Sequence, residues 1–246
     1  MSGSRSVSGL SQIDVVVLAG GLGTRIQSVL GDTPKLLAPV GDQTYLDLLL
    51  DWLQSFGARR VVLSLGHLAD KIIDYVEAHP RADLDIITVT EPEPMGTAGA
   101  LRFVRNRVTS DVALVMNGDS WIDADLAALC TAQVNGDAAG TLLCVCVPDA
   151  GRYGKIDLDV NGRVAAFAEK QKDAGPGLIN AGVYAFSTSA WDIIGASKAR
   201  SLERDIFAKQ PDCLAVFNAG DVPFIDIGTP ESLAQAAAFI QAAKSS

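Results

Sequence analysis

The chain has 246 residues, of which 48% are hydrophobic, so it is long enough to bury the core of one large α/β domain. Its formal net charge of −9 argues against a nucleic-acid partner. No apolar run approaches the ~20 residues that a membrane helix requires, and residues 1–12 lack the apolar segment of a signal peptide. We therefore expect a cytoplasmic protein with no membrane partner. Residues 1–12, rich in Ser and Gly, are expected to be disordered, and residues 13–246 to form one domain.

Strands and helices alternate through the first half of the chain. Apolar runs predict strands over 13–19, 60–65, 85–89 and 112–116, and amphipathic or capped segments predict helices over 45–56, 69–78 and 96–107. This β-α-β-α rhythm predicts a parallel sheet with helices on both faces, in a three-layer α/β/α, Rossmann-like arrangement. Because ligands of such sheets bind outside the carboxyl ends of the strands, the loops 20–25, 91–99 and 117–119 should converge on one site.

The rhythm changes after about residue 138. Strands are predicted over 140–147, 153–158, 163–168 and 178–186, divided by turn residues. These strands indicate a smaller antiparallel or mixed extension that forms the second wall of a cleft. An apolar strand at 224–227 and a last helix from Pro230 to about Ala242 close the chain. The mostly parallel, mixed sheet and its extension are expected to form a single domain.

The most informative motif comes directly after the first strand. It reads Leu18-Ala19-Gly20-Gly21-Leu22-Gly23-Thr24-Arg25, followed by Pro34-Lys35. The glycines leave backbone N–H groups free to surround phosphate oxygens, and Thr24, Arg25 and Lys35 add a hydroxyl and two cations. The loop is neither a Walker motif, since no Gly-Lys-Ser/Thr occurs, nor a dinucleotide fingerprint, since the last required glycine falls on Ile26. The motif predicts a nucleoside triphosphate site.

With its spaced Pro-Lys, this loop resembles the signature of the sugar-phosphate nucleotidyltransferases, also called nucleotide-sugar pyrophosphorylases. The resemblance extends from Ile13 to about Gln241. Several segments, among them Gly177-Leu-Ile-Asn-Ala-Gly-Val-Tyr184 and Ser201-Leu-Glu-Arg-Asp205, are most similar to the guanylyltransferases that act on D-glycero-α-D-manno-heptose 1-phosphate. One departure is that the family loop often has a proline soon after the arginine, where this chain continues Ile26-Gln-Ser-Val-Leu.

Two distant aspartates are candidate metal ligands. Asp119 follows an apolar strand, where aspartates hold divalent cations near phosphates but also begin turns. Asp226 lies inside an apolar strand, where a carboxylate is costly to bury without a partner; it could also make a turn contact before the last helix, although Thr229 is the better cap. The resemblance assigns both aspartates to Mg²⁺.

The nucleotide and sugar sides are assigned by resemblance. Gly96-Thr97-Ala98-Gly99 matches the family's turn at the nucleobase, and Gly118 matches the glycine of the family's Gly-Asp strand end. Glu91 is either a base acceptor or a surface acid. On the sugar side the matching residues are Tyr153, Gly154, Glu169, Lys170, Asn180 and Gly182. Lys170 would neutralise the acceptor phosphate, and Glu169 and Asn180 would contact sugar hydroxyls. His67 is expected to be a loop residue rather than a general base.

The resemblance implies transfer of a nucleotidyl group from a nucleoside triphosphate to a sugar 1-phosphate, and the resemblance to the guanylyltransferases implies that this triphosphate is GTP together with Mg²⁺. Arg25 would stabilise the leaving phosphates and Lys35 the charge at the α-phosphorus. Three alternatives stay open: a mannose or glucose 1-phosphate nucleotidyltransferase with another base, a non-catalytic regulatory subunit that senses nucleotide-sugars, and a glycosyltransferase using Asp123-Ala-Asp125 as its metal motif. This last motif looks instead like the capped start of a helix. A homo-oligomer also stays possible.

Overall fold

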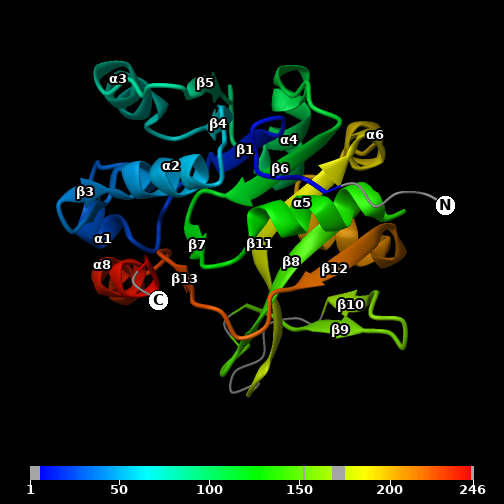
Figure 1. The fold of residues 1–246 in the computed structure, drawn as a ribbon. Coiled ribbons are helices and arrows are strands. Elements are labelled where there is room, and N and C mark those ends of the chain that lie inside the picture. The colour runs from blue at the N-terminus through cyan, green and yellow to red at the C-terminus, as the bar shows by residue number, and fades with distance from the viewer. Residues whose placement is uncertain (1–5, 152, 168–174, 245–246) are drawn as a thin grey trace.

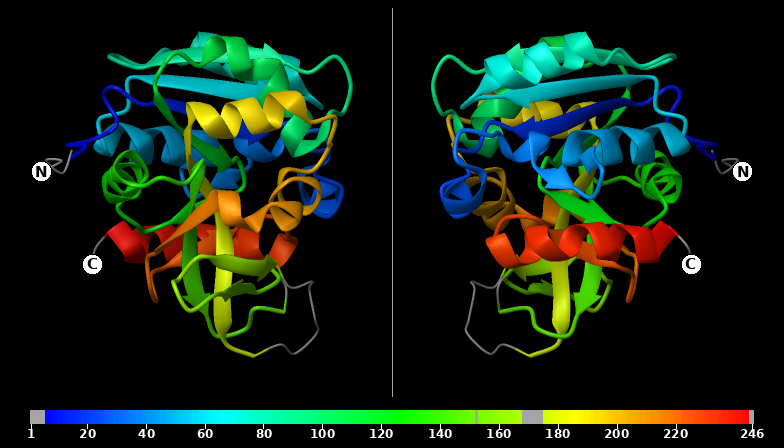
Figure 2. Two further views of the ribbon diagram at one scale, coloured as in Figure 1. Left: turned by 90° about the vertical axis from the view of Figure 1, so that its right-hand side faces the viewer. Right: turned by 90° about the vertical axis from the view of Figure 1, so that its left-hand side faces the viewer.

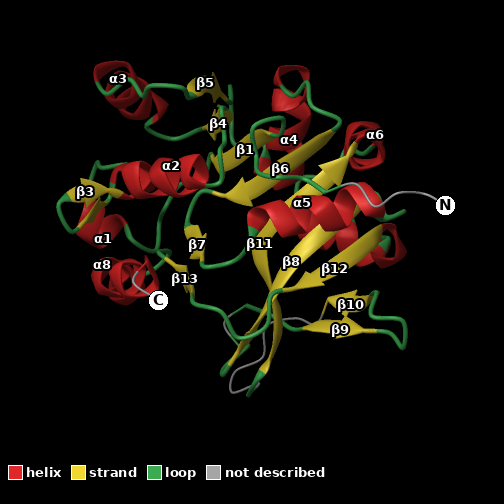
Figure 3. Ribbon diagram, in the orientation of Figure 1, coloured by secondary structure: helices red, strands yellow, loops and turns green. Residues whose placement is uncertain are grey.

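A seven-stranded sheet runs through the centre of the protein in the order β12-β8-β11-β6-β1-β4-β5 (Figures 1 and 3). The computed structural model describes residues 6–151, 153–167 and 175–244. The strands are β1 (Asp14–Ala19), β4 (Arg60–Leu65), β5 (Asp85–Thr90), β6 (Val112–Asn117), β8 (Gly140–Val147), β11 (Gly177–Ser187) and β12 (Leu214–Asn218). Strands β6, β1, β4 and β5 are parallel, and β11 is antiparallel to both β6 and β8. The predicted mixed, mostly parallel sheet is confirmed.

Helices cover both faces of this sheet, as its side-chain alternation requires. Val15 and Val17 of β1 pack into one core, and Val16 between them packs into the other. The first core includes residues of α2 (Tyr45–Ser55), α5 (Leu126–Asn135) and α8 (Pro230–Lys244), and the second includes α4 (Gly96–Val104) and α6 (Thr188–Ala196). Figure 2 shows this arrangement from two opposite sides. The three-layer α/β/α prediction is therefore confirmed.

The smaller elements complete the domain. They are α1 (Gln27–Leu30), α3 (Ala69–Ala78), α7 (Leu202–Asp205), the hairpins β2 (Pro39–Val40) with β3 (Gln43–Thr44) and β9 (Ile156–Leu158) with β10 (Val164–Phe167), and the pair β7 (Ser120–Ile122) with β13 (Phe224–Asp226). Among the helices that the structure describes, none combines the length and apolar character needed to span a bilayer.

The predicted extension exists, but it is partly a continuation of the main sheet. The lower ends of β8 and β11 project beyond the other strands toward the β9–β10 hairpin (Figure 1). The strand predicted from residue 153 begins only at Ile156, and the helix predicted to residue 107 ends at Val104 and continues as a 3₁₀ turn. Helix α6 and strand β12 were not predicted.

The expectation that residues 1–12 are disordered is wrong for residues 7–12. The Val7 N–H donates to Thr131 Oγ1 at 3.0 Å, and the Leu10 N–H donates to the Phe56 carbonyl at 2.7 Å. Leu10 is fully buried in the first core. Apolar residues thus anchor a segment whose Ser/Gly composition suggested disorder, because burial of one leucine outweighs the average polarity around it.

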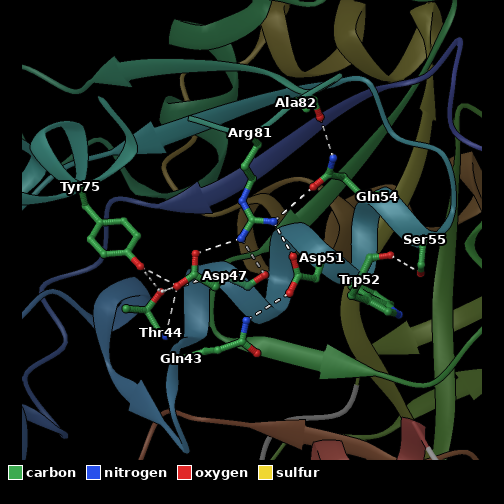
Figure 4. A network of polar contacts seen from close by, with 10 residues as sticks. All are labelled: Gln43, Thr44, Asp47, Asp51, Trp52, Gln54, Ser55, Tyr75, Arg81 and Ala82. Atoms are coloured by element: carbon green, nitrogen blue, oxygen red, sulfur yellow. Dashed lines mark hydrogen bonds and ion pairs between the residues drawn. The ribbon is translucent and has the colours of Figure 1, made fainter. Parts of the chain in front are cut away.

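Helix α2 begins in a network of polar contacts on the side where α3 ends (Figure 4). Thr44 caps the helix by accepting from the Asp47 N–H, and the Asp47 carboxylate accepts in return from the Thr44 N–H. The same carboxylate also accepts from Tyr75 Oη, and Arg81 donates to both Asp47 and Asp51. Burial raises the pKa of Asp47, but the hydrogen bonds from Thr44, Tyr75 and Arg81 outweigh it and hold that pKa below its usual value.

We expect Arg81→Met to lower the free energy of unfolding by about 1–2 kcal/mol at neutral pH, because the largely buried Asp47 loses its cation. A carboxyl whose pKa is depressed by folding contributes stability above its unfolded pKa of about 4 and loses it as the pH falls through the folded pKa. The difference between wild type and variant should therefore shrink below about pH 4. Urea unfolding of wild type and Arg81→Met at neutral pH and below about pH 4 tests this. Arg59→Met, whose ion pair with Asp83 is exposed, is the control and should cost little; an equal loss would contradict the expectation.

Candidate active site

A cavity of about 460 Å³ opens at the carboxyl ends of β1, β4, β5 and β6. The loops 20–25, 91–99 and 117–119 all contribute to its wall, so their predicted convergence is confirmed. The cavity is lined by the following residues singled out from the sequence: Leu18, Ala19, Gly20, Gly21, Gly23, Lys35, Glu91, Gly96, Thr97, Gly118 and Asp119. Most of these residues come together because the loops that follow parallel strands lie at the same edge of the sheet.

Among the residues predicted for the nucleotide, the metal and catalysis, four are not part of that wall: Thr24, Arg25, Ala98 and Asp226. Ala98 departs most from its predicted role at the nucleobase. It is fully buried in the second core, and its N–H donates to the Arg200 carbonyl at 3.0 Å. The small side chain of Ala98 therefore serves the packing of α4 against the sheet.

Lys35 and Asp119 form an ion pair at the cavity wall, with Lys35 Nζ 3.0 Å from Asp119 Oδ2. The lysine begins a 3₁₀ helix, Lys35–Leu37, in which the neighbouring Leu36 is 2% exposed and anchors the turn in the core. The two charged side chains remain 20% and 31% exposed. The pair thus holds one cation and one anion at the surface of the cavity, where phosphate could reach both.

Asp226 is brought next to Asp119 by the short strand pair β7–β13. Asp226 lies opposite Ser120 in the antiparallel register, and the Ile227 N–H donates to the Asp119 carbonyl at 2.8 Å. Two residues 107 positions apart in the sequence therefore lie on adjoining backbone segments. The backbone segments that carry the two aspartates are therefore adjacent, which a shared metal ion would require.

The end of β13 also approaches the glycine loop. The Asp226 carboxylate accepts from the Gly228 N–H at 2.5 Å, so the turn contact foreseen as an alternative is made. A side chain on Gly228 would meet both Asp226 Oδ1, at 2.5 Å, and Arg25 Nη2, at 3.1 Å. Arg25 and Asp226 thus converge on the same glycine. Thr229 caps α8 as predicted, since its hydroxyl accepts from the Ser232 N–H.

These carboxylates fit the ligand chemistry of Mg²⁺. This ion usually takes one or two carboxylates together with water and substrate phosphates. Among the described residues, no group of three or more His, Cys, Asp or Glu side chains gathers as a metal cage. Nearby, Tyr45 is fully buried with its hydroxyl unpaired; burial, and then the charges of Asp119 and Asp226, raise its pKa well above the ordinary value. Both carboxylates therefore lie near the same buried phenol, with Lys35 and Arg25 as the cations beside them.

Glu91 is a buried cavity residue and not a surface acid. It is 8% exposed, and its Oε2 accepts from the Met95 N–H at 3.0 Å. Gly20 packs directly against it: a Cβ at that glycine would lie 2.3 Å from Glu91 Oε1. A side chain at Gly20 would have to displace the Glu91 carboxylate, so glycine at this position lets that carboxylate lie against the wall of the cavity.

On the sugar side, Asn180 and Gly182 lie in an irregular part of β11. The register against β8 shifts between Asn180 and Val183, as expected of a β-bulge. Gly182 has a φ of +73°, and a Cβ there would lie 2.4 Å from Asn117 Nδ2, so only glycine fits. The bulge places this segment beside the end of β6, next to the cavity residue Asn117.

The other sugar-side predictions are less well placed. The Tyr153 ring packs edge-on against Phe224, with centroids 5.5 Å apart, and so lies by β13; Gly154 turns the chain with a φ of +87°. The cavity wall, as formed by the described residues, includes neither Tyr153 nor Gly154. Glu169 and Lys170 lie outside the described residues.

The cavity wall also includes polar residues that were not predicted as functional, among them His67, Asn117 and Arg200. His67 follows β4 and, as expected, sits in a loop, but that loop faces the cavity. Asn117 directly precedes the Gly-Asp motif, so its position was a usable signal. Arg200 donates to the Pro94 carbonyl in the loop 91–95, and no local pattern in the sequence marks that contact.

The alternative metal motif Asp123-Ala-Asp125 has a structural role. Asp125 caps α5, with its carboxylate accepting from the Ala128 N–H at 2.9 Å, as predicted for a helix start. Neither of these aspartates contributes to the cavity wall among the described residues.

The fold and this site are typical of the nucleotidyltransferases: a glycine loop, Lys35 and Asp119 line a cavity at the strand ends, and Asp226 lies on the segment next to Asp119. A family model described as "Nucleotidyl transferase" matches residues 14–243. The chain belongs to this family.

Individual relatives are similar along most of the chain. A mannose-1-phosphate guanylyltransferase of Mycobacterium tuberculosis is 33% identical over 92% of this chain, which spans 64% of that protein. A D-glycero-alpha-D-manno-heptose 1-phosphate guanylyltransferase of Campylobacter jejuni is 31% identical over 89% of this chain and 96% of its own length. HddC from Yersinia pseudotuberculosis, also solved complexed with GMP-PN, is 33% identical, with a TM-score of 0.80 over 92% of this chain and 98% of HddC.

Proposed function

We propose that this protein transfers GMP from GTP to a sugar 1-phosphate, D-glycero-α-D-manno-heptose 1-phosphate in the first instance, and releases pyrophosphate. The observation that carries the proposal is the single cavity that joins the glycine loop to the Lys35–Asp119 pair, with Asp226 adjoining. The named activities of the M. tuberculosis and C. jejuni relatives support a guanylyltransferase.

The reaction is an in-line displacement. A phosphate oxygen of the sugar 1-phosphate forms a bond to the α-phosphorus of GTP, and the bond from that phosphorus to the β-phosphate oxygen breaks, so pyrophosphate leaves with the electron pair. The phosphate anion is already nucleophilic and needs no general base. The protein therefore has to position two phosphates and offset their charge, which is how enzymes of phosphoryl transfer chiefly accelerate the reaction.

The chain's own cations and amides are suited to that task. Backbone N–H groups of Gly20, Gly21 and Gly23 would surround the triphosphate, with Thr24 adding a hydroxyl. Lys35 would move from Asp119 to the α-phosphate, and Arg25, beside Gly228, would stabilise the departing β- and γ-phosphates. Asp119 and Asp226 would hold Mg²⁺, which supplies charge neutralisation at the reacting phosphates when bound.

Glu91 supports guanine as the base. Guanine presents two neighbouring N–H donors on its pairing edge, N1–H and the N2 amino group, and a carboxylate can accept from both. Uracil and thymine present one N–H between two carbonyl oxygens, which a carboxylate repels. A buried Glu91 carboxylate at the cavity wall therefore favours GTP over UTP or dTTP.

The heptose rests on the names of relatives and on the sequence resemblance. Asn180, with Gly182 beside the cavity, would contact a sugar hydroxyl, and Glu169 and Lys170 would bind the sugar and its phosphate. Tyr153 and Gly154 would complete that side from the loop next to β13. Mannose and glucose 1-phosphates are the competing acceptors, because the M. tuberculosis relative is named for mannose 1-phosphate.

A substrate panel tests the proposal. Purified protein with Mg²⁺ is incubated with each of GTP, ATP, UTP, CTP and dTTP against heptose, mannose and glucose 1-phosphates, and pyrophosphate release is measured. We expect the highest kcat/KM for GTP with the heptose 1-phosphate. A preference for another pair would correct the substrates and retain the reaction. If no pair releases pyrophosphate while nucleotide-sugars bind, the protein is a sensor and the proposed reaction is wrong.

A further inference from the structure

A chain of side-chain hydrogen bonds joins Asn180, the candidate sugar ligand, to Thr97 in the cavity wall. Asn180 Nδ2 donates to Tyr184 Oη at 2.9 Å, and Tyr184 Oη donates to Glu203 Oε1 at 2.9 Å. The other oxygen of that carboxylate, Glu203 Oε2, accepts from Thr97 Oγ1 at 3.3 Å. The contacts link β11, α7 and the first turn of α4, three elements distant in sequence.

The direction of donation in this chain is determined by its buried tyrosine. Tyr184 is fully buried, and burial together with the nearby Glu203 carboxylate raises its pKa well above the ordinary value, so the phenol keeps its proton. Its one hydrogen goes to Glu203, which leaves only lone pairs for Asn180. The Asn180 amide must therefore turn its NH₂ group, and not its oxygen, toward Tyr184.

A second contact enforces the same orientation. The Gly182 N–H donates to Asn180 Oδ1 at 2.9 Å, inside the bulge of β11. Both ends of the amide are thus assigned, and Asn180 has one N–H and one oxygen lone pair left for a ligand. A side chain fixed in this way loses little freedom when it binds, so the hydrogen bonds that it makes are stronger in effect.

Glu203 is itself held from the base side of the cavity. Thr97, which lines the cavity, donates its hydroxyl hydrogen to Glu203 and accepts from the Leu202 N–H at 2.8 Å. The hydrogen of the Thr97 hydroxyl is therefore directed to Glu203, and one of its lone pairs to the Leu202 N–H at the start of α7. The position of the Glu203 carboxylate therefore depends on Thr97 in the first turn of α4, directly after the loop 91–95.

We propose that Glu203 and Tyr184 are positioning residues, which orient the Asn180 amide toward the sugar 1-phosphate and tie its position to the base-side end of α4. The inference rests on the proposed function for the identity of the ligand. Its structural part, the fixed amide, does not depend on that function and is tested separately.

The kinetic test compares Tyr184→Phe with wild type. The phenylalanine keeps the ring, which stacks on Phe186, but removes the acceptor of Asn180 and the donor to Glu203. We expect the KM for the sugar 1-phosphate to rise about five- to tenfold, the value of one lost hydrogen bond, with the KM for GTP and kcat within about twofold. The control is Tyr75→Phe. It removes a phenol that donates to Asp47, and neither residue lines the cavity, so neither KM should change.

Variants at Glu203 separate orientation from general damage. In Glu203→Ala, Tyr184 loses its acceptor and can donate to Asn180 instead, so the amide can turn round and the sugar KM should rise as in Tyr184→Phe. Glu203→Gln keeps a carbonyl oxygen for Tyr184 and should restore most of the wild-type KM. Equal increases in both KM values, or no rescue by glutamine, would overturn the positioning role.

A readout without turnover tests the fixed amide itself. In protein labelled with ¹⁵N-asparagine, the Asn180 side-chain signals are assigned by their absence in Asn180→Ser. Tyr184→Phe should shift the Asn180 NH₂ protons upfield, because their acceptor is gone, and Tyr75→Phe should leave them in place. Unshifted signals in Tyr184→Phe would overturn the proposal even if the enzyme is active. Shifted signals in a protein that makes no pyrophosphate would uphold the fixed amide and discard only the proposed reaction.

Discussion

Replacing Asp226 with asparagine is expected to lower kcat by at least ~10²-fold without changing the unfolding temperature. Asparagine keeps an oxygen that can accept from Gly228, so the turn after β13 survives and only the charge is lost. Asp119→Asn should act alike, since its carboxamide can still accept from Lys35. The measurements are pyrophosphate release under saturating substrates, and binding of Mn²⁺ in place of Mg²⁺ in the presence of GTP.

The matched control is Asp123→Asn. Asp123 is exposed, lies four residues after Asp119 and belongs to the alternative Asp123-Ala-Asp125 motif. Its substitution should leave turnover and metal binding unchanged. Near-wild-type turnover in Asp226→Asn, or a large loss in Asp123→Asn, would show that the metal-binding carboxylates have been assigned to the wrong residues.

A large change in base preference is expected from Glu91→Gln. The variant has nearly the same shape and can still accept from the Met95 N–H through its carbonyl oxygen. It then turns an NH₂ group toward the base, which opposes the guanine donors and suits a carbonyl oxygen of uracil or thymine. We expect kcat/KM for GTP to fall about 10²-fold and the preference over UTP and dTTP to narrow, because unpaired polar groups in a base pocket are heavily penalised.

Glu93→Gln is the control for this experiment, as an exposed glutamate two residues further along the same loop. It should leave the GTP preference intact. If Glu91→Gln keeps the full preference for GTP, the carboxylate of Glu91 serves the turn to Met95 and base selection belongs to other groups.

Much of the fold could be predicted because its elements carry local signals. Strand β4, helix α3 and strand β8 begin and end at the predicted residues, since an apolar run or an amphipathic period is followed by a turn residue or proline. The glycine loop was predicted from spacing alone. The proximity of Asp119 and Asp226 was predicted from the family resemblance, together with the cost of burying a carboxylate in an apolar strand.

What the sequence did not predict depends on distant partners. Strand β7 is three residues long and exists because β13 pairs with it. The burial of Ala98, the cavity-facing Arg200 and the contacts of Glu203 arise where α4 and the 197–205 segment pack together. Periodicity carries no information on such contacts, because side chains of these types are equally common on solvated surfaces.

The antiparallel pairing of β6 with β11 has a consequence for how substrates are enclosed. The proposed base half and sugar half of the site adjoin neighbouring strands of one hydrogen-bonded sheet, in register from Val183 with Met116 to Ser187 with Val112. Two lobes joined in this way cannot rotate toward each other as hinged bodies without breaking that ladder. Shielding of the reactants from water is thus left to the peripheral loops, while the floor on which they meet stays rigid.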